Sequence, residues 1–127
     1  MNFMIVDDSP AMRDLMRDVV APWADGVVEC ADGEQCVARF ESARPDWTLM
    51  DVSMPRMDGL DATRAIRVAW PKARILLVTQ QPSVGLSDAA REAGAIGCLA
   101  KEHLHEVPRL LGLRRPADPS GPLPGLG

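Results

Sequence analysis

Residues 47–59 read Trp-Thr-Leu-Met-Asp-Val-Ser-Met-Pro-Arg-Met-Asp-Gly, a short apolar run that ends in an acid and passes into a loop. Residues 47–50 are predicted to form a buried strand, with Asp51 at its carboxyl end. The loop ends near Asp58, which is a favourable N-cap for a helix over residues 60–70. The segment therefore predicts a strand–loop–helix unit that presents a carboxylate where the strand ends.

The same alternation continues outward in both directions along the chain. Short apolar runs rich in β-branched residues predict strands at residues 3–6, 27–30, 47–50, 75–78 and 96–99. Amphipathic stretches after each run predict five helices, the last three at residues 60–70, 86–93 and 104–111. Strands three to five are nearly all apolar, as expected when both faces of a sheet are covered. The alternation predicts an α/β fold, a doubly wound parallel sheet with helices on both faces.

Length and composition agree with a single domain of ordinary size. The chain has 127 residues, of which 46% are apolar, and a net charge of −4. It lacks the clustered Lys and Arg of a nucleic-acid-binding surface and any apolar run long enough to span a bilayer. The N-terminus lacks the features of a signal peptide, so a cytoplasmic protein is expected. The three cysteines, Cys30, Cys36 and Cys98, fit neither a disulfide framework nor a zinc site and are expected to be small buried hydrophobes.

Pro and Gly become abundant after the last predicted helix. From Gly112 onward the apolar periodicity ends, and the segment is too poor in apolar side chains to bury much surface. We therefore predict one domain over residues 1–111 and a flexible tail over residues 112–127. The tail contains no helix-turn-helix pattern.

Polar side chains follow four of the five predicted strands, at the edge where open α/β sheets bind ligands. They are Asp7 and Asp8, Asp51, Thr79 and Lys101. Three carboxylates in one cleft repel one another and need a cation, and oxygen ligands without His or Cys favour Mg²⁺ over zinc. A lysine and a hydroxyl opposite them suit phosphoryl oxygens. Each residue alone is as well explained by a turn or a solvated surface, but together they predict phosphoryl transfer onto a carboxylate.

Four segments resemble the receiver domain of bacterial response regulators, over residues 1 to about 111. They are Val6-Asp7-Asp8-Ser9, the stretch from Met50 to Gly59, Leu77-Val78-Thr79, and the stretch from Gly94 to Lys101. The second segment is highly specific, with Pro four and Gly eight residues after Asp51, and the order of all four is more specific still. The resemblance implies a flavodoxin-like three-layer sandwich with a five-stranded sheet in the order 2-1-3-4-5, flanked by five helices.

The resemblance also implies roles for the acidic residues. Asp51 resembles the phosphoacceptor of the family. Asp8 and Asp51 would bind Mg²⁺ directly, together with the backbone carbonyl of Ser53. Asp7 would act on the ion through bound water.

Two further residues are implied to act on the phosphoryl group. Lys101 would pair with it, and Thr79 would turn inward to donate a hydrogen bond to one of its oxygens. The accompanying movement of the loop after strand four would bias an inactive–active equilibrium of the face formed by helix four, strand five and helix five.

The switch region departs from the family pattern. Cys98 stands where the family usually has Tyr or Phe, which puts the aromatic half of the switch in question. Glu102 follows the lysine where many members have a cis-proline, and a trans bond is expected because a cis non-proline bond costs about 3 kcal/mol. Gln80 and Gln81 replace the smaller residues favoured after the Thr. Ser53 and Gln81 flank the path of an attacking water and are expected to tune phosphate loss.

The leading hypothesis is a stand-alone phosphoacceptor receiver, resembling chemotaxis or phosphorelay receivers. It would take a phosphoryl group from a sensor histidine kinase or histidine phosphotransfer protein and act through protein contacts, without diffusible substrate, direct nucleic-acid binding or membrane association. The helix four to helix five face would bind a downstream protein and is a possible homodimer interface. Two alternatives remain: the receiver piece of a longer DNA-binding regulator, and a pseudo-receiver that binds partners without phosphorylation. An Asp-nucleophile phosphatase is disfavoured because Asp7-Asp8-Ser9 lacks the required Asp-x-Asp.

Overall fold

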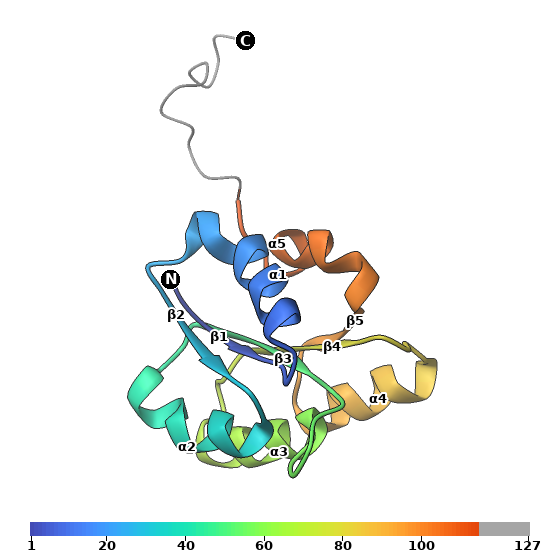
Figure 1. The fold of residues 1–127 in the computed structure, drawn as a ribbon. Helices are drawn as coiled ribbons and strands as arrows, with labels where there is room; N and C mark the ends of the chain where they lie inside the picture. The colour runs from blue at the N-terminus through green and yellow to red at the C-terminus, as the bar shows by residue number, and fades with distance from the viewer. Residues whose placement is uncertain (115–127) are drawn as a thin grey trace, which may run out of the picture.

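A computed structural model describes residues 1–114 and shows alternating strands and helices (Figure 1). The strands are β1 (Asn2–Val6), β2 (Gly26–Cys30), β3 (Trp47–Asp51), β4 (Ile75–Thr79) and β5 (Gly97–Ala100). The helices are α1 (Pro10–Val20), α2 (Gly33–Ala43), α3 (Gly59–Ala69), α4 (Val84–Ala93) and α5 (Val107–Leu110), with 3-10 segments η1 (Ala21–Trp23) and η2 (Lys101–Glu106). The tail was predicted over residues 112–127, and its part from residue 115 onward lies outside the described residues.

The five strands form one sheet in the order β2-β1-β3-β4-β5, and every neighbouring pair is parallel. Figure 1 shows α1 and α5 on one face and α2, α3 and α4 on the other. This is the predicted doubly wound, three-layer arrangement. The strand order reverses beside β1, so the carboxyl ends of β1 and β3 border the crevice where such sheets bind ligands.

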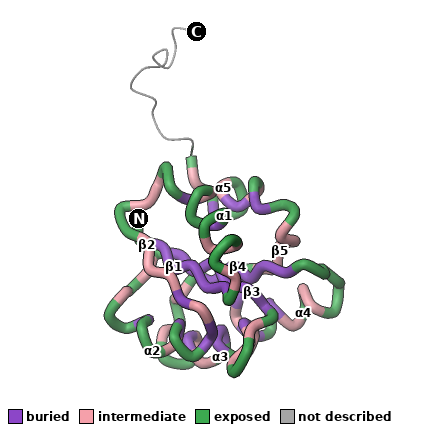
Figure 2. Tube along the Cα trace, viewed as in Figure 1, coloured by how far each residue is buried: buried purple, intermediate pink, exposed green. Residues whose placement is uncertain are grey.

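Two apolar cores lie between the sheet and its helix layers. One contains Met4 and Leu77 of the sheet with Cys36 and Ile66 of α2 and α3, and the other packs Ile5 against α1 and α5. Figure 2 shows the central strands as the buried part of the chain. β3 and β4 are buried over their whole length, so their ends are held rigidly.

Side-chain caps define where the helices begin. Ser9 accepts a hydrogen bond from the Met12 N–H, Asp32 from Gln35, Asp58 from Asp61, and Ser83 from Leu86. These contacts satisfy donors that have no partner inside the helix. The predicted cap at Asp58 is therefore confirmed.

The last elements differ from the sequence-based prediction. The predicted helix over residues 104–111 is wrong in its first half, because residues 101–106 form a 3-10 segment with a non-helical backbone at His103. Only Val107–Leu110 is α-helical, with Pro108 in its first turn, where the missing N–H is tolerated.

Strand β5 also differs, because it begins one residue later than predicted and leaves Ile96 45% exposed. It is half-buried throughout because it lies at the edge of the sheet. Of the three strands predicted to be covered on both faces, only β3 and β4 are fully buried.

Cys30 and Cys36 are buried, as predicted, whereas Cys98 on β5 is only half-buried. Within residues 1–114 every peptide bond is trans, including Lys101–Glu102. In the same range, none of the helices has both the length and the apolar character required to cross a membrane.

Candidate functional site

A cavity of about 300 Å³ opens at the carboxyl ends of β1, β3 and β4. The strand pairing brings these ends together, since Val6 lies opposite Met50 and Asp51 lies opposite Val78. The cavity is lined by Asp7, Asp8, Ser9, Met12, Asp51, Ser53, Thr79, Gln80, Gln81 and Lys101. Every residue predicted for the site lines this cavity except Cys98.

Asp7 is completely buried and tightly held. Its N–H donates to the Cys30 carbonyl at 3.1 Å, and its Oδ1 accepts from the Ser9 N–H at 2.9 Å. Its Oδ2 lies 2.9 Å from the Lys101 Nζ. These contacts fix the first carboxylate of the acidic pair, whereas Asp8 is exposed to solvent at the mouth of the cavity.

Lys101 bridges two carboxylates. Besides its contact with Asp7, its Nζ lies 3.3 Å from the Asp51 Oδ1. Burial lowers the pKa of Lys101, but the hydrogen bond to Asp7 and the charges of both carboxylates outweigh it and leave the pKa raised. The lysine therefore stays cationic over the neutral pH range.

Asp51 ends β3 with only 5% of its surface exposed. Burial raises the pKa of Asp51 above its ordinary value, and the negative charge of Asp7 raises it further. Lys101 and the Ser53 N–H, which donates to the Asp51 Oδ1 at 3.3 Å, oppose this shift. An ionised Asp51 is thus costly without an additional cation.

The loop after Asp51 folds back onto the end of its own strand. The Gly59 N–H donates to the Val52 carbonyl at 2.8 Å. A Cβ at position 59 would lie 2.3 Å from the Asp51 carbonyl oxygen, closer than any real contact. Only glycine allows this approach. The close approach of the loop therefore accounts for the glycine at its fixed spacing after Asp51.

Thr79 is buried at the end of β4, and its Oγ1 accepts from the Gln81 N–H at 3.2 Å. Gln80 and Gln81 are both exposed beside it. The hydroxyl is therefore positioned by the loop that would have to move with it.

Cys98 lies behind the cavity wall rather than in it. It is opposite Leu77 in the β4–β5 pairing and packs against the same apolar core as Leu86 of α4. Because strand residues alternate between faces, Cys98, Leu77 and Thr79 share one face of the sheet. The position is suited to sense movement of Thr79, but a thiol fills little of the space that an aromatic ring would occupy.

The carboxylates of Asp7, Asp8 and Asp51 form a cluster that could hold a divalent cation. One carboxylate oxygen from each of Asp7, Asp8 and Asp51 lies within 4.8 Å of the other two. The Asp7 Oδ2 is buried, and the Lys101 Nζ lies 2.9 Å from it. All-oxygen ligands of high negative charge suit Mg²⁺, so the residues present fit such an ion.

Sequence reasoning missed part of the cavity. Ser9 and Met12 were assigned no role at the site, yet both line the cavity. Arg13 was not singled out, although it contacts the backbone of Asp7. Spacing along one helix does not show which side chains reach a neighbouring strand.

Comparison with known proteins decides the family. The sequence profile of the response regulator receiver domain matches residues 3–109. This chain belongs to the response regulator receiver family. Receivers are signalling modules of two-component systems, and the family assignment agrees with the sheet order and the acidic crevice described above.

Several solved receivers share the fold. A LuxR-family response regulator from Aurantimonas sp. is 31% identical, with a TM-score of 0.77 over 93% of this chain and 89% of that chain. The response regulator domain of Thermotoga maritima CheB is 28% identical, with a TM-score of 0.75 over 88% of this receiver and 91% of its own length.

Curated relatives are longer than this receiver. The transcriptional regulatory protein YxjL of Bacillus subtilis is 35% identical over 80% of this chain but only 48% of its own length. A protein-glutamate methylesterase/protein-glutamine glutaminase of Hahella chejuensis is 39% identical over 76% of this chain and 28% of its own length. The chain thus spans half or less of these relatives.

Proposed function

We propose that this receiver accepts a phosphoryl group on Asp51 from a sensor histidine kinase or a histidine phosphotransfer protein. The observation that carries the proposal is the arrangement around Asp51, where Asp7, Asp8, Thr79 and Lys101 meet in one cavity. A buried acid with a lysine 3.3 Å away and two further carboxylates beside it suits phosphoryl transfer rather than structural support.

In the proposed transfer, a carboxylate oxygen of Asp51 forms the new O–P bond. The P–N bond to the donor histidine breaks in line, and its electron pair returns to the imidazole. Lys101 supports charge on the equatorial oxygens. Thr79 accepts from the Gln81 N–H, and its own O–H is available to donate to one of these oxygens.

Asp8, Asp51 and the Ser53 carbonyl are proposed to bind Mg²⁺, with Asp7 acting through water. When bound, the ion neutralises the carboxylates and the phosphoryl oxygens during transfer. The residues around Asp51 also hold its carboxylate ready, because Ser53 and Lys101 both contact Oδ1.

The output surface proposed here is the face formed by α4, β5 and α5. Large apolar side chains are exposed on both of its helices, Val84 at 81% on α4 and Leu110 at 41% on α5, and Ile96, just before β5, is 45% exposed. Exposed apolar residues on adjoining elements are typical of protein contacts, whether with a downstream partner or with a second copy. The proposal includes no catalysis beyond the domain's own phosphorylation and dephosphorylation.

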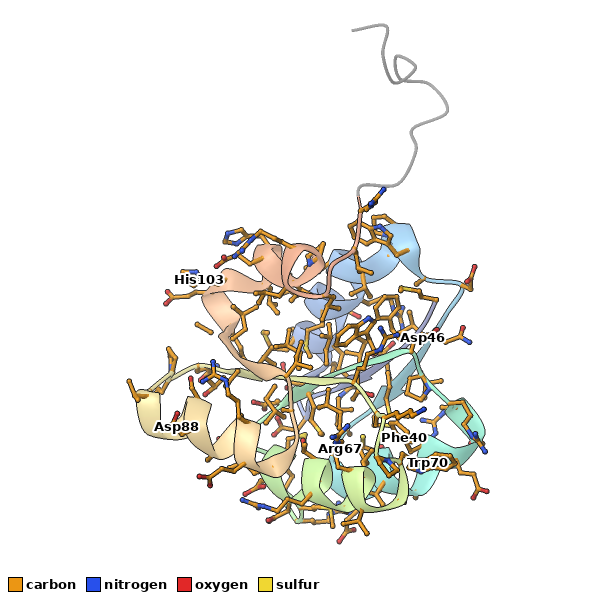
Figure 3. All side chains as sticks on the ribbon, turned by 180° about the vertical axis from the view of Figure 1, so that it is seen from behind. Phe40, Asp46, Arg67, Trp70, Asp88 and His103 are labelled. Carbon is orange, nitrogen blue, oxygen red and sulfur yellow. The ribbon has the colours of Figure 1, made fainter. Side chains whose placement is uncertain are left out.

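The test is labelling by acetyl phosphate with Mg²⁺, measured by intact mass. The wild type should gain one phosphoryl group, and chelation of Mg²⁺ should prevent the gain. Asp51→Asn should stay unlabelled. Asp88→Asn is the matched control, because Asp88 is an exposed acid on α4 (Figure 3) and is not among the residues that line the cavity, so it should label normally.

Absence of labelling in the wild type, together with failure of every candidate kinase, would favour the pseudo-receiver. Cys98 in place of an aromatic residue is the feature that points in that direction. Labelling that survives in Asp51→Asn would refute the assignment of the acceptor.

A second candidate is the receiver portion of a longer transcription regulator. It is favoured by the match to YxjL, a transcriptional regulatory protein of which this chain covers 48%. Sequencing the gene past the codon for Gly127 tests it, since an open reading frame that encodes a DNA-binding domain would establish this alternative.

A further inference from the structure

The peptide that joins Asp7 to Asp8 is held by a side chain from α1. The Arg13 Nη1 donates to the Asp7 carbonyl oxygen at 2.7 Å. Because the Asp7 carbonyl and the Asp8 nitrogen share one rigid plane, this bond sets the direction in which the chain enters Asp8.

Arg13 is itself oriented from the edge of the sheet. Its Nε lies 3.1 Å from the Glu29 Oε1 on β2, and the side chains of Arg13 and Glu29 are only 19% and 25% exposed. A planar guanidinium with two contacts on different atoms has a fixed orientation. Arg13 therefore links α1, β1 and β2 at the point where the acidic pair begins.

Asp8 has no comparable support of its own. It is exposed, and within residues 1–114 its carboxylate makes no hydrogen bond or ion pair. The position of its oxygens thus depends on the backbone that carries it. The position of the Asp8 carboxylate is therefore sensitive to the contacts that orient the peptide between Asp7 and Asp8.

We propose that Arg13 is a positioning residue for the cation site, held in place by Glu29. The inference rests on the proposed function, in which Asp8 binds Mg²⁺, and it adds a residue that touches neither the ion nor the phosphoryl group. Partners that orient metal ligands affect metal affinity strongly. The positive charge of Arg13 opposes a cation, and Glu29 offsets that charge, so its net effect on affinity comes from orientation.

The same helix offers a matched control. Arg17 lies one turn after Arg13 and forms an ion pair with the other oxygen of Glu29, Oε2, but it makes no hydrogen bond to the Asp7 carbonyl. Arg13→Gln and Arg17→Gln remove the same charge from the same helix. Only the first removes the bond to the peptide of the acidic pair.

The experiment is a calorimetric Mg²⁺ titration of the full chain and its variants. Arg13→Gln should raise the Mg²⁺ Kd about tenfold. Arg17→Gln should stay within about twofold of the wild type. Arg13→Lys keeps the charge, but a lysine cannot bridge both partners of the guanidinium, so its Kd should also rise above that of Arg17→Gln.

Acetyl phosphate labelling gives a second readout. The Mg²⁺ concentration for half-maximal labelling should rise in Arg13→Gln, whereas the rate at saturating Mg²⁺ should return close to that of the wild type. If Arg13→Gln does not unfold cooperatively, Glu29→Gln replaces it as the test variant. Glu29→Gln should also raise the Mg²⁺ Kd.

The outcomes separate the two proposals. Equal Kd values for the Arg13 and Arg17 variants overturn the positioning role and leave the phosphoacceptor proposal intact. A wild type that neither binds Mg²⁺ nor becomes labelled overturns both.

Discussion

At the scale of single residues, the negative charge of Asp51 is unfavourable in the folded protein. Burial and the neighbouring Asp7 raise its pKa, and Lys101 compensates only in part. The carboxylate that would accept a phosphoryl group is therefore one that the folded protein accommodates poorly until a cation arrives. Cost in stability is the usual consequence of placing a reactive charge in a buried site.

Asp51→Asn should therefore stabilise the protein without Mg²⁺ at pH 7, by about 1 kcal/mol. A raised pKa in the folded state means that the wild type loses stability as the pH rises from 3.8 through the folded-state pKa. The gain from Asp51→Asn should thus be largest above that pKa and shrink as the pH falls toward 3.8. Urea unfolding at a series of pH values measures it.

Asp88→Asn removes one carboxylate at an exposed position and is the matched control for the loss of charge. A variant Asp51→Asn that is less stable than the wild type at pH 7 would show that the contact with Lys101 outweighs burial and the repulsion from Asp7.

At the scale of elements, β3, its loop and α3 form the unit that presents Asp51. The sequence predicted its strand, its acid and its cap, because period, turn chemistry and capping are local properties. It did not predict the reason for Gly59, since the close approach to the Asp51 carbonyl depends on how the loop returns. The wrong boundaries of β5 and of the last helix have a similar cause, because the packing of β5 at the sheet edge and of the last helix against α1 is a tertiary property.

Two glycine substitutions test this unit. Gly59→Ala should cost about 2–3 kcal/mol, since its Cβ would meet backbone atoms that cannot move away. Gly85→Ala in α4 should stabilise by about 0.5 kcal/mol, because its Cβ would meet open space and the unfolded chain loses freedom. Urea unfolding midpoints give both values. Similar effects at the two positions would contradict the geometry of the loop.

At the scale of the whole molecule, the C-terminal helix completes the core beneath α1. Leu104, Val107 and Leu111 are all buried there, and Leu113 packs against them. Trp23 donates a hydrogen bond from its Nε1 to the Arg114 carbonyl, which joins the end of the described chain to η1. We propose that the folding unit extends to this residue, beyond the predicted boundary at 111, and that the predicted flexible tail adds no stability.

A chain of residues 1–114 should therefore unfold at the same temperature as the full chain, within a few degrees, and keep its response to Mg²⁺. A chain of residues 1–103 should not fold cooperatively, because three buried side chains worth about 1.5–3 kcal/mol each are lost from a margin of about 5–15 kcal/mol. Circular dichroism melting measures both. A large drop for residues 1–114 would place the boundary further along the chain.

The sequence by itself determined the fold class and the polar residues at the strand ends, because these follow from periodicity and spacing along the chain. The strand order was implied only by the resemblance to a known family. Only the tertiary structure decided which side chains from other elements support them. Met12 of α1 lines the cavity, Arg13 of α1 donates to the Asp7 carbonyl, and Glu29 of β2 contacts Arg13. Such contacts depend on how a helix packs on a sheet, which no local pattern specifies.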